Sequence, residues 1–227
     1  MAHEEPLTGA RLRTPRAAAV AGILFSVLLG LALILILISA PSDPTAPGAW
    51  LSDPARRATI AVALNLVPFA GIAFLWFIGV VRDRIGQLED RFFASVFLGS
   101  GLLFVAMLFA GAAFSGGIVA EVAAGSAATP GPDALALSRQ ITSLLLHLYA
   151  MRMAAVFTMS AATITLRTGV IPRWIGMLGI AVAVVLLVSV GLTLWIELLF
   201  PAWILLLSVD ILRTGLRRSP RAGLGET

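Results

Sequence analysis

The chain has 227 residues, of which 59% are hydrophobic and 12% charged, and its mean hydropathy is +0.98. A soluble domain carries about 25% charged residues, so this composition excludes an ordinary soluble domain and indicates a helical membrane protein. The chain has no cysteine, which excludes disulfides and thiolate metal sites, and its net charge of +4 is too small to indicate nucleic acid as a partner.

The N-terminal segment 1–16 is polar, contains prolines and has no apolar period, which predicts a disordered tail. The apolar segment that follows, 17–39, exceeds the roughly 7–15 residues of a signal-peptide core, which favours a membrane span over a cleaved signal. Small residues recur at every fourth position of this segment, at Ala18, Gly22, Ser26 and Gly30. Because such a series lets another helix approach closely, we expect it to contact a membrane-protein partner or a second copy.

Hydropathy predicts six membrane spans in all, at about 17–39, 58–81, 92–114, 140–166, 173–193 and 196–213. Residues 175–212 are apolar almost throughout and too long for one span, so we divide them at a turn near Gly191–Glu197. The Gly/Ala/Pro-rich segment 115–133 is predicted to be a flexible, exposed loop, and 215–227 a basic tail.

Glycine and proline refine these boundaries. Gly169 is predicted to be a helix C-cap and Pro172 to occupy the first position of the next helix. Pro68 and Pro201 are expected to break the second and sixth spans.

The basic residues, all of which are arginine, indicate how the spans are oriented. With six spans and the N-terminus inside, twelve arginines fall on the inner side and three on the outer, and Arg152 lies within a span. This bias is the one that the positive-inside rule expects. The sequence therefore predicts an all-α, polytopic bundle of six transmembrane helices with a cytoplasmic N-terminus and C-terminus and the lipid bilayer as its surroundings.

Tryptophan placement agrees in part with this topology. Trp50 and Trp195 fall at the outer boundary and Trp76 and Trp174 at the inner one, as expected for interfacial aromatic residues. Trp203, inside the sixth span, does not fit this pattern.

Polar residues within the spans are the candidate functional site. They gather in the outer half of the predicted bundle: Arg152, Tyr149, His147, Asn65, Glu197 and Gln140. Arg152 is expected near the membrane midplane, where a charge is costly and usually functional. Glu197 is its first candidate counter-ion and Glu121, in the predicted loop, the second.

Two interpretations of these residues stay open. They form either an outward-facing polar vestibule that ends at Arg152 and binds an anion or a lipid headgroup, or a set of hydrogen bonds that hold helices together. On a regular helix these residues lie on two faces: Gln140 and His147 share one face, and Arg152 and Tyr149 share another.

The sequence carries no catalytic or cofactor motif. Its two histidines, His3 and His147, are too few for a bis-histidine haem or three-histidine metal site, and it has no Gly-rich phosphate loop or GxSxG motif. We therefore expect no cofactor, no metal and no catalytic residue.

Three segments carry a resemblance to a known group of proteins. They are Met151-Arg152, the turn from Arg167-Thr168-Gly169 to Pro172-Arg173-Trp174, and Phe200-Pro201 with Trp203. The last three predicted helices, which hold them, resemble small multi-spanning membrane proteins of high-GC bacteria that have no assigned function. The resemblance implies a multi-pass protein of the bacterial cytoplasmic membrane and implies no substrate.

Three functions are compatible with these features. The first expectation is a non-enzymatic accessory or structural subunit that acts through contacts between helices. The alternatives are a transporter or channel-like protein that uses the polar vestibule, and a lipid-modifying membrane enzyme.

Overall fold

The computed structural model describes residues 14–39, 53–85, 91–124, 132–169, 171–189 and 194–218, and the regular structure in these ranges is entirely helical. The helices are α1 (Thr14–Ser39), α2 (Pro54–Ile85), α3 (Arg91–Ala124), α4 (Pro132–Ser143), η2 (Leu144–Ala150), α5 (Met151–Thr168), α6 (Arg173–Val188), α7 (Leu194–Glu197) and α8 (Leu199–Arg218). Among them η2 is a π-helix, and it joins α4 to α5 without a break.

Five helical stretches are long and apolar enough to cross a membrane, which is the property of a multi-pass membrane protein. They are Arg16–Ser39, Pro54–Arg82, Phe92–Ala124, Ala136–Thr168 and Trp195–Thr214. Between the last two lies α6, an apolar helix of 16 residues, which corresponds to the predicted fifth span.

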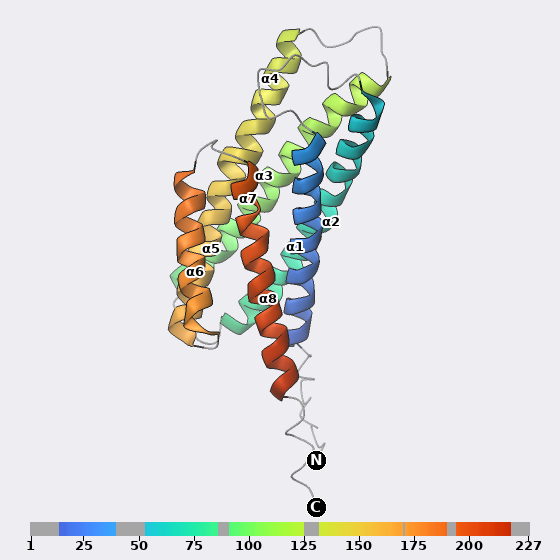
Figure 1. Cartoon of the computed structure of the whole chain (residues 1–227). Helices are drawn as coiled ribbons and strands as arrows, with labels where there is room; N and C mark the ends of the chain where they lie inside the picture. The colour runs from blue at the N-terminus through green and yellow to red at the C-terminus, as the bar shows by residue number, and fades with distance from the viewer. Residues whose placement is uncertain are drawn as a thin grey trace, which may run out of the picture.

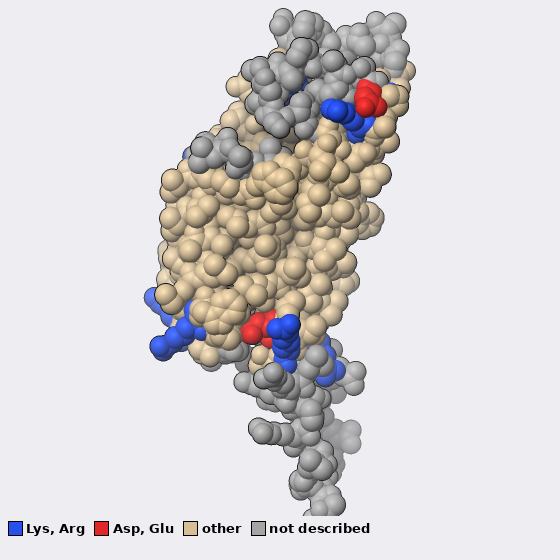
Figure 2. All heavy atoms as spheres, viewed as in Figure 1, with Lys and Arg blue, Asp and Glu red and all other residues tan. Residues whose placement is uncertain are grey.

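The helices pack lengthwise in one bundle (Figure 1), and its two ends differ. We call the end where α1 starts and α8 finishes the terminal end, and the opposite end, where α1 finishes and α2 starts, the distal end. On the face drawn in Figure 2, charged side chains lie toward the two ends and a belt of other residues separates them. Such a belt is what a bilayer requires of a protein surface that faces its hydrocarbon.

Phenylalanine fills the centre of the bundle. Seven buried rings from five helices form one connected set: Phe25, Phe74, Phe77, Phe97, Phe104, Phe157 and Phe200. The ring centroids of Phe25 and Phe74 are 4.4 Å apart, and those of Phe97 and Phe157 are 4.5 Å apart. Contacts of this kind add to the stabilisation that burial of the rings provides.

Trp203 belongs to this packed interior, which explains why it did not fit an interfacial pattern. Its side chain is 2% exposed, and its Nε1–H donates a hydrogen bond to the Ile175 carbonyl of α6 at 3.1 Å. A Cβ atom on Gly179 would lie 2.7 Å from the Trp203 ring, so the glycine is needed for α6 to approach α8 this closely. Trp76, Trp174 and Trp195 are all largely exposed, whereas Trp50 lies outside the described residues.

The small-residue series of α1 faces the interior of the same chain. Ala18, Gly22 and Ser26 are buried, and a Cβ atom on Gly22 would lie 2.0 Å from Ser208 Oγ of α8 and 2.8 Å from Phe77 of α2. Gly30 has open space at the corresponding position. The close helix approach that the first three residues permit is therefore made by α2 and α8, and an interface with a second copy through them stays an untested prediction.

Near the distal end the helices are longer than predicted. The segment 115–133 was expected to be a loop, but α3 continues to Ala124 and α4 begins at Pro132, so the loop prediction is wrong for most of its length; 125–131 lie outside the described residues. Ile60 of α2 and Val119 of α3 form a small second core here. Glycines such as Gly116 and Gly117 are tolerated in this helix, as is common in membrane helices.

Two of the three proline predictions need correction as well. Pro68 lies inside a continuous α2, so the predicted break there is wrong. Pro201, the third residue of α8, follows an interruption of the helix at Leu198, so the sixth predicted span is broken next to this proline, as expected. Pro172 is the N-cap residue of α6 and does not occupy its first position. Gly169 is confirmed as a C-cap, with φ of 61° and its N–H bonded to the Thr165 carbonyl.

The boundaries of the predicted tails and of the last predicted turn also differ from those in the structure. Residues 14–16 and 215–218, predicted as parts of tails, are helical, while 1–13 and 219–227 lie outside the described residues. The turn expected near Gly191–Glu197 is helical from Leu194 onward, so that Glu197 ends the single-turn helix α7. Between α7 and α8 only Leu198 is not helical.

Candidate functional site

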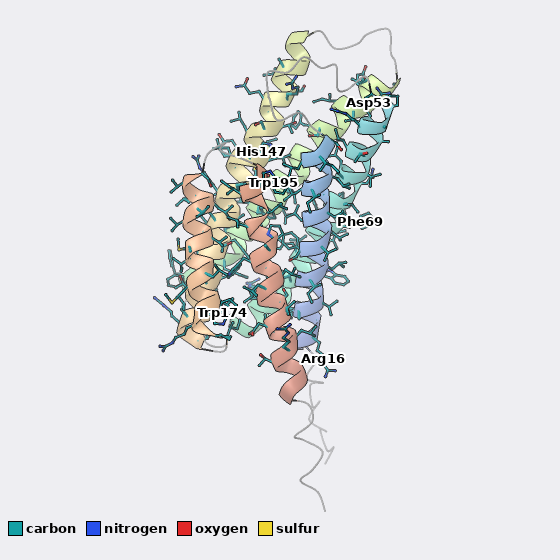
Figure 3. The ribbon with its side chains drawn as sticks, in the orientation of Figure 1. Arg16, Asp53, Phe69, His147, Trp174 and Trp195 are labelled. Atoms are coloured by element: carbon teal, nitrogen blue, oxygen red, sulfur yellow. The ribbon has the colours of Figure 1, made fainter. Side chains whose placement is uncertain are left out.

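The candidate site is built around an imidazole and a carboxylate from helices far apart in the sequence. His147 Nδ1 of η2 is hydrogen-bonded to Glu197 Oε1 of α7, in a pair that is ionic when the imidazole is protonated. The Glu197 side chain is 9% exposed and that of His147 31%, so the carboxylate is buried and the imidazole is reached from one side. Figure 3 shows His147 and Trp195, the exposed neighbour of Glu197, toward the distal end of the bundle.

Each partner is carried by an irregular helix. A π-helical turn holds more residues than an α-helical one. Such turns are rare in proteins, and those that occur are often found at functional sites. The seven residues of η2 therefore rotate α5 relative to α4, and the helical-wheel positions calculated for a regular helix do not apply across them. On the other side, the break at Leu198 separates α7 from α8 and lets Glu197 turn toward η2.

Packing on α3 fixes η2 in place. Leu146 lies over Gly111 of α3 so closely that a Cβ atom on this glycine would be 2.5 Å from Leu146 Cγ and Cδ2. Ala150, the last residue of η2, is fully buried. His147 is thus held on a segment whose neighbouring residues are anchored in the core.

Arg152 does not join the pair. It is partly buried at the start of α5, and within the described part of the chain it has neither a hydrogen bond nor an ion pair. Glu197, expected as its first counter-ion, bonds His147 instead, and this expectation is wrong because no ion pair joins the carboxylate to Arg152 in the described part of the chain. The second candidate, Glu121, has an interaction of its own that does not involve Arg152.

The antiparallel packing of α5 and α6 gives the level of Arg152 along the bundle, whereas its depth in a membrane stays a prediction. The two helices meet at the turn of Gly169 to Pro172, so residues equally far from this turn lie at similar levels. Arg152 precedes Thr168 by 16 residues, and Val188 follows Arg173 by 15. Arg152 therefore lies level with the distal end of α6, about 24 Å from the turn, and in the middle of the apolar stretch Ala136–Thr168.

The remaining candidate residues do not converge on the pair. Tyr149 is 50% exposed on η2, and Gln140 is exposed on α4. Asn65 is exposed on α2, where its Nδ2–H donates to the Ala61 carbonyl one turn earlier at 2.8 Å. Of six candidate residues, the structure brings together only His147 and Glu197.

This arrangement can exchange a proton and does little else by itself. An imidazole and a carboxylate in contact can share or pass a proton, and either group alone can accept one. Three histidine, aspartate or glutamate side chains suited to a metal ion do not occur together anywhere in the described ranges.

Sequence reasoning did not find what completes this site. The π-helix has no sequence signal that we recognised, and the Leu146–Gly111 contact depends on how α3 packs. A pairing of His147 with Glu197 was obscured by the regular-helix geometry assumed across 140–152.

Comparisons with protein-family models, with curated proteins and with solved structures gave no match.

Proposed function

We propose that the chain crosses the bacterial cytoplasmic membrane six times, with both termini in the cytoplasm, and serves as a non-enzymatic accessory or structural subunit. The placement of the arginines supports the orientation, and α6, as the fifth span between α5 and α8, brings the total to six. The subunit acts on its neighbours through the apolar faces of its helices.

The observation that carries the subunit proposal is the aromatic centre. A transport pathway through a bundle needs polar or hydrated residues along its axis, because a substrate must exchange its water for protein groups. Here the centre is filled by seven phenylalanine rings from α1, α2, α3, α5 and α8. The polar candidates Asn65, Gln140 and Tyr149 lie on exposed faces and line no common path.

A second candidate function is a proton-coupled transporter, which the His147–Glu197 pair favours. Ionisable residues within membrane helices commonly mark proton or ion pathways, and discontinuous helices such as α7–α8 are common at transporter binding sites. In this function Arg152 would attract an anion to the distal end.

Proton flux distinguishes the two functions. The purified protein is reconstituted in liposomes that contain a pH-sensitive dye, and a pH step is applied with and without chloride or phosphate. We expect the parent and Glu197→Gln to give the same flux as empty liposomes. A flux that depends on an anion and is abolished by Glu197→Gln and Arg152→Met, but not by Asn65→Ala, would overturn the subunit proposal and support the transporter.

A further inference from the structure

A shallow groove lies on the outside of the bundle at the terminal end, away from His147 and Glu197. It is formed between the first turn of α1 and the last turns of α2 and has a volume of about 370 Å³. Its walls are Ala17, Leu75, Trp76, Gly79 and Val80. These side chains carry one polar atom among them, the indole N–H, so the groove suits an apolar occupant.

Two residues of α2 give the groove its shape. Gly79 has no side chain, and a Cβ atom built on it would meet no atom within 4 Å, so the space above it is open. Trp76, one turn earlier, is 70% exposed and stands beside this space as a flat apolar wall. A narrow, flexible hydrocarbon chain can lie over a glycine and against an indole in this way.

Positive charge lies at one end of the groove. Arg16 directly precedes Ala17, and Arg82 follows Val80 by two residues; both are exposed at the terminal end, where Figure 3 labels Arg16. In the sequence, Arg13 lies three residues before Arg16, and Asp83 and Arg84 follow Arg82. The segments 13–16 and 82–84 therefore hold four arginines and one carboxylate, and their formal charge is positive. Guanidinium groups bind phosphate through paired, charge-assisted hydrogen bonds.

We propose that this groove is a binding site for one anionic phospholipid. An acyl chain lies across Gly79 against Trp76, and the phosphate lies between Arg16 and Arg82 at the membrane surface. The combination of an apolar groove with cations at one end matches the two parts of such a lipid, and each arginine near the surface strengthens its binding about fivefold. The proposal requires only that α1 and α2 lie in a membrane, and it is independent of the function proposed above.

The fluorescence of Trp76 can report which lipid occupies the groove. The full-length protein is placed in nanodiscs with increasing fractions of a brominated lipid, either phosphatidylglycerol or phosphatidylcholine, which quenches nearby indoles. Subtracting the fluorescence of Trp76→Phe isolates Trp76 from the other four tryptophans. We expect half-maximal quenching at a several-fold lower fraction of phosphatidylglycerol than of phosphatidylcholine.

Variants test each part of the site. Arg82→Gln should raise the half-quenching fraction of phosphatidylglycerol about fivefold and leave that of phosphatidylcholine unchanged. Gly79→Leu should fill the groove and reduce quenching by both lipids. The matched controls are Arg173→Gln, which removes an exposed charge from another helix at the terminal end, and Gly99→Leu, at a glycine of α3 that also has open space. Both controls should behave like the parent.

Four results would overturn the proposal. Equal quenching by the two lipids would make the occupant ordinary bulk lipid, and an equal loss with Arg173→Gln would make the charge effect general. Removal of the preference by millimolar inorganic phosphate would identify a free anion in place of a lipid. Absence of quenching by either lipid would show that protein, such as a second copy, covers Trp76.

Discussion

The polar side chains that form hydrogen bonds within the helices do so in two different ways. Ser26, Ser100, Thr158 and Asn65 each donate to a carbonyl one turn earlier in their own helix, at 2.7 to 2.8 Å. Such bonds need no other helix and therefore imply no site. His147 and Glu197 differ because they bond each other across two helices, and loss of His147 leaves the buried carboxylate unpaired.

A double-mutant cycle on this pair measures its contribution. Glu197→Ala and His147→Ala should each lower the free energy of unfolding in detergent by about 1–3 kcal/mol, and the two effects should couple by at least about 0.5 kcal/mol. Unfolding by titration with sodium dodecyl sulfate gives both values. Asn65→Ala combined with Glu197→Ala is the control and should be additive, since Asn65 bonds its own helix. Additivity of the His147 and Glu197 variants would contradict the contact.

The polar residues were easier to find from the sequence than their partners. Arg152, His147 and Glu197 stand out because ionisable groups are rare in apolar segments. Which of these side chains contact one another depends on the wider, π-helical turns of η2 and on the break at Leu198. Both features depend on tertiary packing, which a helical wheel does not represent.

At the scale of the helices, glycine decides where backbones approach. Gly22 and Gly179 lie under side chains of α8, and Gly101 lies under Ile78 and Phe157, so that a Cβ atom on any of the three would be within 3.0 Å of a neighbour. Gly30, by contrast, has open space. Identical residues in one helix therefore have different roles.

Alanine substitutions in α1 test this difference. Gly22→Ala should lower the free energy of unfolding by about 1–3 kcal/mol, because the new methyl group would lie 2.0 Å from Ser208 Oγ. Gly30→Ala is the matched control and should change it by no more than about 0.5 kcal/mol. Adding Ser208→Ala to Gly22→Ala should recover part of the loss, with Phe77 accounting for the remainder. Equal effects at the two glycines would contradict the packing.

Helix positions were largely predictable from hydropathy, and their ends were less so. Each of the six predicted spans overlaps a helical stretch in the described ranges, as expected for segments that must bond their own backbone internally. The extension of α3 to Ala124 was missed because glycine and alanine were taken as loop formers. The small-residue series of α1 correctly indicated close packing, but the sequence does not tell whether the neighbouring helix belongs to the same chain.

At the scale of the molecule, the aromatic centre joins five of the helices. Phe74 of α2 contacts five other rings, with centroid distances from 4.4 to 6.2 Å. No sequence pattern marked these phenylalanines, because apolar residues at lipid-facing and buried positions of a membrane helix look alike.

Two phenylalanines of α2 provide a matched comparison. Phe74→Ala should lower the free energy of unfolding by about 3–5 kcal/mol, because it opens a cavity among packed rings. Phe69→Ala, at a residue that is 63% exposed, should change it by no more than about 0.5 kcal/mol. Figure 3 shows Phe69 on the outside of the bundle. Similar losses for the two variants would place Phe74 outside the core.

The cysteine-free sequence makes the proposed topology directly measurable. Single cysteines are introduced as Ser52→Cys, before α2, and Ser219→Cys, after α8. In intact cells a membrane-impermeant maleimide should label the first and not the second, and it should label both after the cells are opened. Labelling of both in intact cells would rule out a cytoplasmic C-terminus, and labelling of neither would rule out an external segment before α2.

In the proposed six-span topology, the shortness of α6 has a consequence for the lipid beside it. Sixteen helical residues extend about 24 Å, whereas a typical hydrocarbon core is about 30 Å thick. This hydrophobic mismatch is confined to one side of the molecule, since α1 and α2 have 26 and 32 residues. In that topology the bilayer next to α6 would thin locally, which favours lipids with shorter chains there. Thinning would also draw the headgroup region down toward Arg152 and His147, so that membrane thickness itself would control how much water reaches the buried pair.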